Sequence, residues 1–387
     1  MTFRSKLPDV GTTIFSVISR RASELDAINL GQGFPDFDID PLLAQQVFEA
    51  MQQGHNQYAP MPGVPALLEA IAAKLSRSYA VSVDPGSEIT VTLGATEAIY
   101  SAVQALVGPG EEAIVFDPSY DSYDPAVRLA GATCVRIPLE PPAFSYDWDR
   151  VRSTVNGRTR LLIVNTPHNP ACTCLVGDDL RQLERLVHDF GLYVIADEVY
   201  EHMVFDGRAH RSVLSIPALR ARAVAVFSFG KTLGATGLRI GYAVAPADLT
   251  AEVRKVHQFN TFTIATALQV AVARYLQQRP DVGARLSDFY AGKRDRLIAG
   301  LSASGLALRP SAGSFFQLID YSALSRAGDT VMAERLLEQA GVASIPLSVF
   351  YRRPPPMTLL RLCFAKQDQT LDAGAARLQQ YLQGMTR

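Results

Sequence analysis

Residues 193–200 read YVIADEVY and residues 224–231 read VAVFSFGK, and these two stretches decide the fold. Each is a short apolar run that ends in polar residues. Similar apolar runs occur at residues 88–93, 113–116 and 161–165. Stretches with a helical pattern separate the runs, and apolar strands that alternate with helices are typical of a mainly parallel sheet covered on both faces. The sequence therefore predicts an α/β fold between about residues 88 and 245.

The parts of the chain on either side of this region follow other patterns. Helices are predicted at residues 249–259, 264–278 and 282–302, and strands of a smaller α+β region at residues 315–319 and 359–363. The chain has 387 residues, which is long for one hydrophobic core and favours two domains. We expect a large domain at residues 46–285, a small domain at residues 286–387, and an N-terminal segment at residues 1–45 that packs with the small domain.

Composition and charge exclude several classes of function. Hydrophobic residues make up 48% of the chain, charged residues make up 19%, and the formal net charge is -1. This is the profile of a globular protein without the basic field that attracts nucleic acid or anionic lipid. The first residues hold no apolar secretory signal, and no apolar run is long enough to span a membrane. Cys172 and Cys174 lack the CxxC spacing of redox or zinc sites, so we expect reduced thiols and a cytoplasmic location.

Polar and aromatic residues follow each predicted strand. They lie at residues 94–96 (GAT), 117–120 (DPSY), 165–170 (NTPHNP), 197–200 (DEVY) and 228–231 (SFGK). In an open parallel sheet, ligands bind beyond the carboxyl ends of the strands. The sequence therefore predicts that these residues meet at one site.

The residues of this set have a chemical and an ordinary structural interpretation. Residues 94–96 precede a helix expected to begin at Glu97, and they could bind a phosphate through free N–H groups or form a common tight turn. A buried Asp197 needs a partner such as a protonated ring nitrogen, but it could equally be an ion pair or a helix cap. Lys231 could form a Schiff base if it is shielded from water, whereas most lysines are solvated.

One serine and two arginines are candidate anion ligands. Ser228 and Arg239 could hold phosphate oxygens, or they could be a turn hydroxyl and a surface cation. Arg361 lies inside the apolar run at residues 359–363, where it could clamp a substrate carboxylate or form an internal salt bridge.

Two apparent motifs fail on spacing. Residues 230–232 (GKT) resemble the end of a Walker A motif, but that motif needs a glycine at position 225, which holds alanine. Glu198, Glu201 and His202 lack the HExxH spacing of a zinc site. We therefore expect no metal, and a solvated helix face at Glu198, Glu201 and His202.

Taken together, these residues resemble the class I/II aminotransferases of pyridoxal-5′-phosphate (PLP) fold type I. The most specific part is the ordered set at residues 169–170 (NP), 197–200 and 228–231, with Arg239 eight residues later. The resemblance begins at residues 29–36 and ends at residues 360–364. It is strongest to the methionine aminotransferases of the kynurenine aminotransferase/glutamine transaminase K branch, on residues 56–60, 116–123 and 345–350.

The resemblance implies the cofactor PLP and a role for each candidate residue. Lys231 bonds to the cofactor and then moves a proton, and Asp197 pairs with the pyridine nitrogen. Asn169 and Tyr200 hydrogen-bond the phenolic oxygen of the ring, on which Tyr120 stacks. The phosphate is held by Ala95, Thr96, Ser228, Arg239 and, from the neighbouring subunit, Tyr58. The substrate carboxylate is bound by Arg361, Asn169 and Gly33.

The resemblance also implies the fold, the partners and the reaction. The fold is a large PLP-binding domain with a mainly parallel seven-stranded sheet flanked by helices, plus a smaller α+β domain. The partners are an L-amino acid donor (methionine, aromatic or glutamine-like), a 2-oxo acid acceptor and a second copy of the chain, and the kinetics are ping-pong. One alternative is a PLP-dependent carbon–sulfur β-lyase on the same fold. Another alternative is a non-catalytic PLP-binding regulator. We rank this alternative far below the enzyme, because such regulators carry a DNA-binding module ahead of the PLP domain and the resemblance here starts within the first thirty residues.

Overall fold

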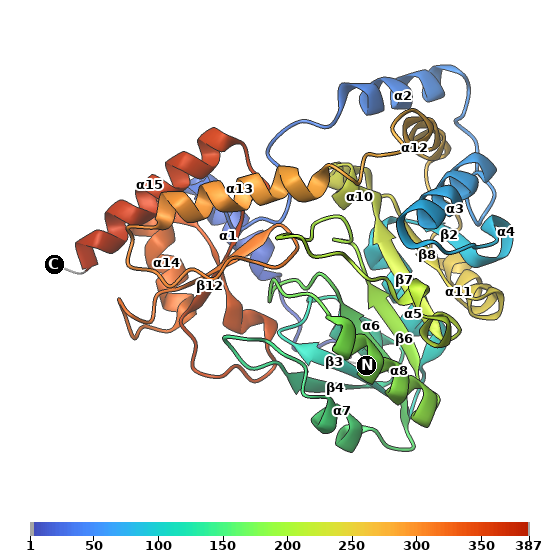
Figure 1. The fold of residues 1–387 in the computed structure, drawn as a ribbon, viewed down its shortest axis with the longest axis horizontal. Helices are drawn as coiled ribbons and strands as arrows, with labels where there is room; N and C mark the ends of the chain where they lie inside the picture. Colours follow the sequence, from blue (N-terminus) through green and yellow to red (C-terminus); the bar gives the residue numbers. More distant parts are fainter. Residues whose placement is uncertain (1–3, 386–387) are drawn as a thin grey trace.

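The computed structural model describes residues 4–385, and its larger sheet has seven strands in the order β2-β8-β7-β6-β5-β3-β4 (Figure 1). The strands are Ile89–Thr92 (β2), Glu112–Asp117 (β3), Thr133–Pro138 (β4), Thr159–Asn165 (β5), Tyr193–Asp197 (β6), Ala223–Ser228 (β7) and Gly241–Val244 (β8). Strands β4, β3, β5, β6 and β7 run parallel to one another, while β8 is antiparallel to both β2 and β7. The predicted mainly parallel seven-stranded sheet is confirmed.

Helices cover both faces of this sheet. The main ones are Pro65–Tyr79 (α3), Gly94–Leu106 (α5), Gly177–Phe190 (α8) and Ala247–Asn260 (α11). On β7, Ala225 and Phe227 share a hydrophobic cluster with α3 and α8, whereas Val224 and Val226 share another with α5 and α11. Successive side chains of a strand point to opposite faces, so a strand that is covered on both sides is apolar throughout, as β7 is.

A smaller region of strands and helices holds a separate hydrophobic cluster. Its strands Phe316–Asp320 (β9), Ile345–Pro346 (β11) and Leu359–Cys363 (β12) form an antiparallel sheet in the order β11-β12-β9. Its helices are Leu286–Leu301 (α13), Asp329–Gln339 (α14) and Asp368–Met385 (α15). Both strands predicted in this region are present, and β9 is shifted by one residue from its predicted start.

The N-terminal segment contacts both regions of the molecule. Ile28–Asn29 (β1) pairs in parallel with Val342–Ala343 (β10) of the smaller region, and Ile14–Glu24 (α1) lies beside β10. Pro41–Gln52 (α2) instead packs against Thr266–Gln278 (α12) beside the larger region (Figure 1). The domain boundaries at residues 45 and 285 stay a proposal, because α2 extends on both sides of residue 45.

Several elements differ from the sequence-based expectation. The sequence does not predict β4, an edge strand whose side chains are partly exposed, or β8, which has four residues and begins with Gly241. Helix α5 begins at Gly94 rather than at Glu97, and α13 begins at Leu286 rather than at residue 282. Shorter helices occupy Pro85–Glu88 (α4), Tyr123–Leu129 (α6), Trp148–Thr154 (α7), Pro217–Arg220 (α9) and Phe229–Thr232 (α10).

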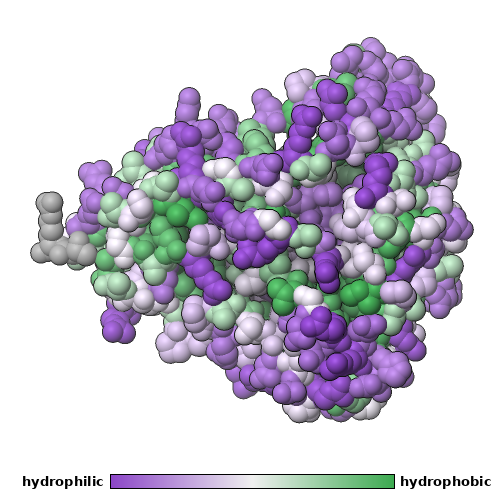
Figure 2. Space-filling model, viewed as in Figure 1, coloured by the Kyte–Doolittle hydropathy of each residue, from purple (hydrophilic) through white to green (hydrophobic). Residues whose placement is uncertain are grey.

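The surface is mostly hydrophilic. On the face shown in Figure 2, hydrophobic residues gather only in smaller patches between hydrophilic ones. Large exposed aromatic side chains nevertheless occur, and Tyr58 and Phe259 are 85% and 86% exposed. Among residues 4–385, no helix is both long enough and apolar enough to cross a membrane.

Candidate active site

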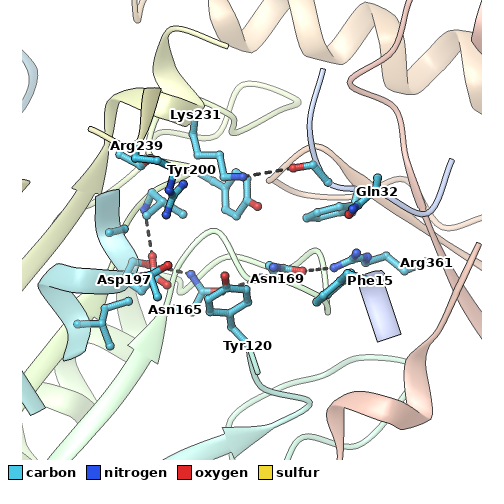
Figure 3. A pocket seen from close by; sticks show the side chains of 17 residues that line it. Phe15, Gln32, Tyr120, Asn165, Asn169, Asp197, Tyr200, Lys231, Arg239 and Arg361 are labelled. Atoms are coloured by element: carbon cyan, nitrogen blue, oxygen red, sulfur yellow. Dashed lines mark hydrogen bonds between the residues drawn. The ribbon is translucent and has the colours of Figure 1, made fainter. Parts of the chain in front are cut away.

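A cavity of about 220 Å³ lies at the carboxyl ends of β5, β6 and β7 (Figure 3). Eleven of the twelve site residues proposed from the sequence line it, namely Gly33, Ala95, Thr96, Tyr120, Asn169, Asp197, Tyr200, Ser228, Lys231, Arg239 and Arg361. The twelfth, Tyr58, does not line the cavity, and its side chain points into solvent in the single chain. Residues far apart in the sequence therefore meet in one place.

Lys231 follows β7 on the short helix α10 and lines the cavity. Its Nζ donates a hydrogen bond to the carbonyl oxygen of Gly33 at 3.3 Å and lies 5.0 Å from the ring centre of Phe315 and 5.7 Å from that of Tyr200. Desolvation of the amine lowers the pKa of Lys231 to about 8. About a tenth of this side chain is therefore a neutral amine at pH 7, far more than for an ordinary lysine, and a neutral amine is a nucleophile and a base.

Asp197 ends β6 and is buried. Burial raises the pKa of its carboxyl to about 6, against the opposing effect of two hydrogen bonds. Tyr123 donates its hydroxyl to Oδ2 at 2.5 Å, and the N–H of Val199 donates to Oδ1 at 3.3 Å. Among residues 4–385, no Lys or Arg forms a salt bridge with Asp197. A cation bound in the cavity would supply the partner that this carboxylate lacks.

The part of the cavity beside the start of α5 is electropositive. Helix α5 begins there at Gly94, with Ala95 and Thr96 in its first turn. Gly94 has φ +69°, and a Cβ at this position would lie 2.8 Å from Nη2 of Arg239, so the guanidinium closely approaches the start of the helix. Ser228 adds a hydroxyl. Free N–H groups, the positive end of a helix and an arginine together fit a phosphate group.

Arg361 of β12 faces the cavity from the smaller region, and only 1% of its surface is exposed. Its Nη1 donates to Oδ1 of Asn169 at 2.5 Å and its Nη2 donates to the carbonyl of Gly31 at 3.2 Å, while its Nε is buried without a partner. The guanidinium lies 3.8 Å from the ring centre of Phe316. Burial lowers the pKa of Arg361 from its ordinary value. The internal salt bridge weighed from the sequence is not found among residues 4–385, which leaves this cation available to a substrate carboxylate.

The cavity also has lining residues that the sequence did not indicate, namely Phe15, Gln32, Ile99 and Phe316, while Asn165 and Val199 come from the predicted strand-end stretches without having been given a role. Phe15 comes from α1, where no strand-end pattern points to a site. Its ring centre lies 5.2 Å from the guanidinium of Arg361 and 5.8 Å from the ring of Phe350. Tyr123, the donor to Asp197, is also absent from the predicted set, although its position three residues after Tyr120 was a usable signal.

The expected solvated helix face at Glu198, Glu201 and His202 is wrong. These residues belong to a turn after β6, not to a helix, and Glu198 and Glu201 are only 0% and 4% exposed. They are buried because the turn packs between the sheet and α3, where Lys74 and His210 supply partners for the two carboxylates. Polar residues in a sequence do not reveal such partners when the partners are far away in the chain.

Sequence comparison identifies the relatives of this chain. Residues 26–378 match the family model described as aminotransferase class I and II. A methionine aminotransferase of Escherichia coli K12 is 50% identical over 377 residues, which cover 97% of this chain and 98% of that protein. A probable N-succinyldiaminopimelate aminotransferase of Mycobacterium tuberculosis is 40% identical over 97% of both chains.

Solved structures give the same result. The structure of YbdL from Escherichia coli, which has been identified as having a methionine aminotransferase function, superposes with a TM-score of 0.96 at 50% identity. The superposition covers 98% of this chain and 100% of that one. An aspartate aminotransferase of Thermus thermophilus with maleate superposes with a TM-score of 0.89 at 31% identity and covers 98% of this chain and 100% of that one.

Proposed function

Because the chain belongs to the class I and II aminotransferases, we propose that it moves the amino group of L-methionine to a 2-oxo acid with PLP as its cofactor. Aromatic amino acids and glutamine are further donors in this proposal. The family and the 50% identity to a methionine aminotransferase make the chain a transaminase. The observation that carries the proposed cofactor and substrate is the single cavity lined by Lys231, Asp197 and Arg361.

The residues present fit the three functional groups of PLP. The start of α5 with Arg239 offers positive charge to a phosphate. Asp197 offers a buried carboxylate to the ring nitrogen. Lys231 offers a desolvated amine to the aldehyde. An anion site, a carboxylate and an amine in one cavity therefore correspond to the phosphate, the ring nitrogen and the aldehyde of the cofactor.

When bound, PLP supplies an aldehyde that accepts the amino group and a protonated ring that accepts the electron pair released at the substrate α-carbon. Lys231 would hold the aldehyde of the bound cofactor through Nζ. Once that amine is free, Nζ of Lys231 would serve the substrate α-proton as a general base and then as a general acid. Asp197, as a carboxylate, would keep the ring nitrogen protonated.

Three further residues support the ring. Oδ1 of Asn169 already accepts from Arg361, so its amide N–H group is left to donate to the phenolic oxygen of the ring. Tyr200 lies with its ring centre 5.0 Å from that of Phe315, edge to face, and its hydroxyl would be the second donor to that oxygen. Tyr120 lines the same cavity and would stack on the ring. Asn169 thereby connects the cofactor to the arginine that binds the substrate.

The substrate end favours a carboxylate with an apolar side chain beside it. Arg361 binds the carboxylate, with Asn169 and the backbone of Gly33 next to it. Phe15 and Phe316 add aromatic surface around the guanidinium. A thioether is flexible and polarisable and packs well against aromatic rings, which supports methionine as the donor.

An absorbance spectrum before and after methionine tests cofactor and donor together. We expect a yellow band at roughly 360–430 nm that moves to roughly 330 nm when methionine is added without an acceptor. If the band stays in place with methionine but moves with an aromatic amino acid, the donor is an aromatic amino acid and not methionine. Release of pyruvate and ammonia from a cysteine conjugate without an acceptor would indicate the β-lyase alternative. A protein that stays colourless with added PLP would contradict the proposal.

The proposal includes a homodimer in which Tyr58 reaches the phosphate of the neighbouring subunit. In the single chain Tyr58 is 85% exposed and its ring packs edge to face on Phe262 with 5.5 Å between ring centres. Phe262 is itself 41% exposed, and Phe259, three residues before it in the chain, is 86% exposed. Exposed apolar surface of this kind favours contact with another chain. Analytical ultracentrifugation tests the dimer, and a monomer at micromolar concentration would refute it.

A cytoplasmic location is also part of the proposal. All four cysteines (Cys134, Cys172, Cys174 and Cys363) are free thiols, which suits a reducing compartment.

A further inference from the structure

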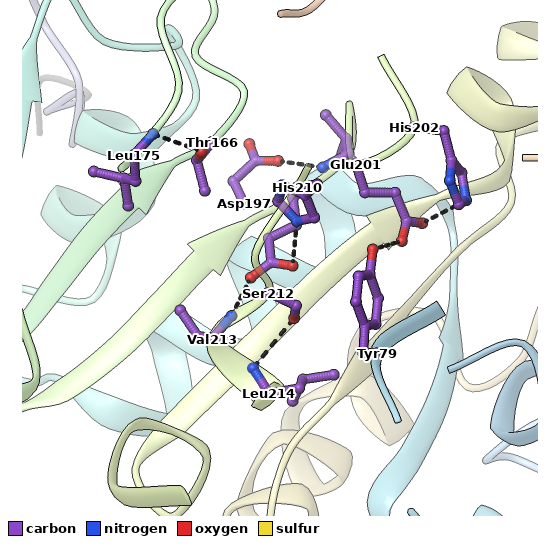
Figure 4. Close-up of polar contacts among 12 residues, drawn as sticks. Tyr79, Thr166, Leu175, Asp197, Glu201, His202, His210, Ser212, Val213 and Leu214 are labelled. Carbon is purple, nitrogen blue, oxygen red and sulfur yellow. Dashed lines mark hydrogen bonds and ion pairs between the residues drawn. The ribbon is translucent and has the colours of Figure 1, made fainter. Parts of the chain in front are cut away.

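A second set of charged and phenolic side chains is buried behind the turn that carries Tyr200 (Figure 4). The turn is closed by hydrogen bonds from the N–H of Glu201 to the carbonyl of Glu198 at 2.9 Å and from the N–H of Met203 to the carbonyl of Tyr200 at 2.8 Å. Asp197 and Tyr200 line the cavity, whereas Glu198 and Glu201 do not. The side chains of this segment therefore divide between the active site and a separate buried cluster.

We call Lys74, Tyr79, Glu201 and Tyr242 the back cluster. Lys74 of α3 forms an ion pair with Oε1 of Glu201, and Tyr79 donates its hydroxyl to Oε2. The Lys74 and Glu201 side chains are only 10% and 2% exposed. Burial acts to raise the pKa of Glu201, but Lys74 and His202 outweigh it and lower this pKa to about 2. Glu201 is therefore an ionised carboxylate held in a fixed place by groups from α3.

The back cluster also contacts the segment that carries Lys231. Nζ of Lys74 lies 5.0 Å from the ring centre of Phe227 and donates to the hydroxyl of Tyr242 at 3.1 Å. The ring of Tyr242 stacks on Phe227 with 4.9 Å between centres and lies 5.0 Å from the ring of Phe229. Phe227 and Phe229 flank Ser228, and Lys231 follows two residues after Phe229. One buried ammonium group thus touches both strand ends.

Glu198 anchors the same turn at a second point. Its Oε1 accepts the N–H of Val213 at 2.9 Å, and its Oε2 lies 2.9 Å from Nε2 of His210. Tyr200, in contrast, is held on the cavity side by ring contacts with Phe315 and Phe316 at 5.0 Å and 6.1 Å. The direction of the Tyr200 side chain therefore depends on the backbone of a turn that is fastened from behind.

From these contacts, and resting on the proposed function, we infer that Lys74 and Glu201 are positioning residues that set Tyr200 and Lys231 relative to each other. The pair connects the turn after β6 to Phe227 at the end of β7 and, through Tyr242, to Phe229 after it, and neither residue lines the cavity. Burying two charges costs desolvation free energy that an apolar pair of the same size avoids, so stability alone does not explain the pair. A role in fixing the distance between the ends of β6 and β7 explains why the buried ion pair is present.

The test compares two carboxylate-to-amide variants of the holoenzyme. Glu201→Gln breaks the buried ion pair with Lys74, and Asp206→Asn breaks an ion pair with Arg294 that is remote from the cavity. In this control pair the Arg294 side chain is 4% exposed and the Asp206 side chain is 43% exposed, so the pair is less buried than that of Lys74 with Glu201. We measure the pH titration of the yellow band, the affinity of the apoprotein for PLP and the melting temperature of the apoprotein. For Glu201→Gln we expect the midpoint of the titration to shift by about 0.5–1 pH unit and PLP affinity to fall about fivefold. For Asp206→Asn we expect the titration midpoint and the PLP affinity to stay at wild-type values, even if the melting temperature falls as much as it does in Glu201→Gln.

A folded Glu201→Gln protein with the wild-type midpoint and affinity, or with changes no larger than those of Asp206→Asn, would overturn the inference. If Glu201→Gln does not fold, Tyr79→Phe decides, since it removes one hydrogen bond to the carboxylate and keeps the ion pair. A smaller shift in Tyr79→Phe supports positioning, and an unchanged midpoint overturns it. If the wild-type protein forms no yellow band with PLP, the proposed function is wrong, and the inference that rests on it is wrong as well.

Discussion

Two desolvated lysines on opposite sides of the same strand ends have opposite electrostatic settings. Lys74 is buried in an ion pair with Glu201 and hydrogen-bonds Tyr242, so its charge is satisfied within the chain. Lys231 lines the cavity, and among residues 4–385 its one hydrogen-bond acceptor is the carbonyl of Gly33. The back cluster is electrostatically complete, and the cavity is not. The difference teaches that the reactive site is where desolvated charges still lack their partners.

The largest expected effect on turnover comes from removing Lys231, the lysine whose amine has no ion-pair partner among residues 4–385. Lys231→Ala leaves no amine to hold the aldehyde or to move the α-proton, so we expect turnover to fall by about 10⁴-fold or more. The measurement is the steady-state rate with methionine and a 2-oxo acid, together with the loss of the yellow band. If the variant, purified free of wild-type enzyme, turns over at a near-normal rate, then Lys231 is not the reactive lysine and the contrast with Lys74 is wrong.

A matched pair of arginines sharpens the same contrast. Arg361 is 1% exposed and has no carboxylate partner in the described part of the chain, whereas Arg294 is 4% exposed and pairs with Asp206 and Asp295. Lysine keeps the charge but loses the planar pair of donors, so we expect Arg361→Lys to lower kcat/KM for the amino acid by about 10²-fold. Arg294→Lys should change the melting temperature alone. Equal losses of kcat/KM in the two variants would contradict a substrate role for Arg361.

The unpaired carboxylate of Asp197 should cost stability in the apoprotein. Burial raises its pKa from 3.8 to about 6, so the folded chain binds the proton more tightly and loses stability as the pH rises between those values. We therefore expect Asp197→Asn to stabilise the apoprotein at pH 7 by about 1–2 kcal/mol, or about 1–3 °C in melting temperature, while it lowers the rate. Thermal denaturation at pH 7 and below pH 4 checks this, since the difference should disappear where the wild-type carboxyl is protonated. An equal gain at both pH values would rule out charge burial as the cause.

The smallest expected effect is at the exposed Tyr58. If its hydroxyl reaches the phosphate of the neighbouring subunit, Tyr58→Phe should weaken PLP binding about fivefold, the value of one hydrogen bond, and leave the dimer intact. Equilibrium dialysis of PLP and analytical ultracentrifugation measure the two quantities. Unchanged PLP binding in a dimeric variant would show that this cavity is completed without Tyr58.

Local sequence patterns located most of the site. Asp197, Ser228 and Lys231 stand next to continuous apolar runs, and such runs mark the ends of buried parallel strands where ligands bind. Phe15 and Tyr123 were missed for different reasons. Phe15 reaches the cavity from an amphipathic helix near the N-terminus, and its sequence resembles any half-buried helical residue. Tyr123 lies behind Asp197 and acts only through it.

The sequence by itself determined the class of the sheet, the strand-end residues that gather beside it and the family to which they belong. These depend on alternating apolar runs and short motifs, which are properties of neighbouring residues. Only the tertiary structure decided that Glu198 and Glu201 are buried and that Arg361 lacks an internal carboxylate. The physical reason is that the cost of a buried charge depends on its partners, and Lys74 is 127 residues from Glu201 in the chain. Such partners are brought together by packing, and no local pattern encodes them.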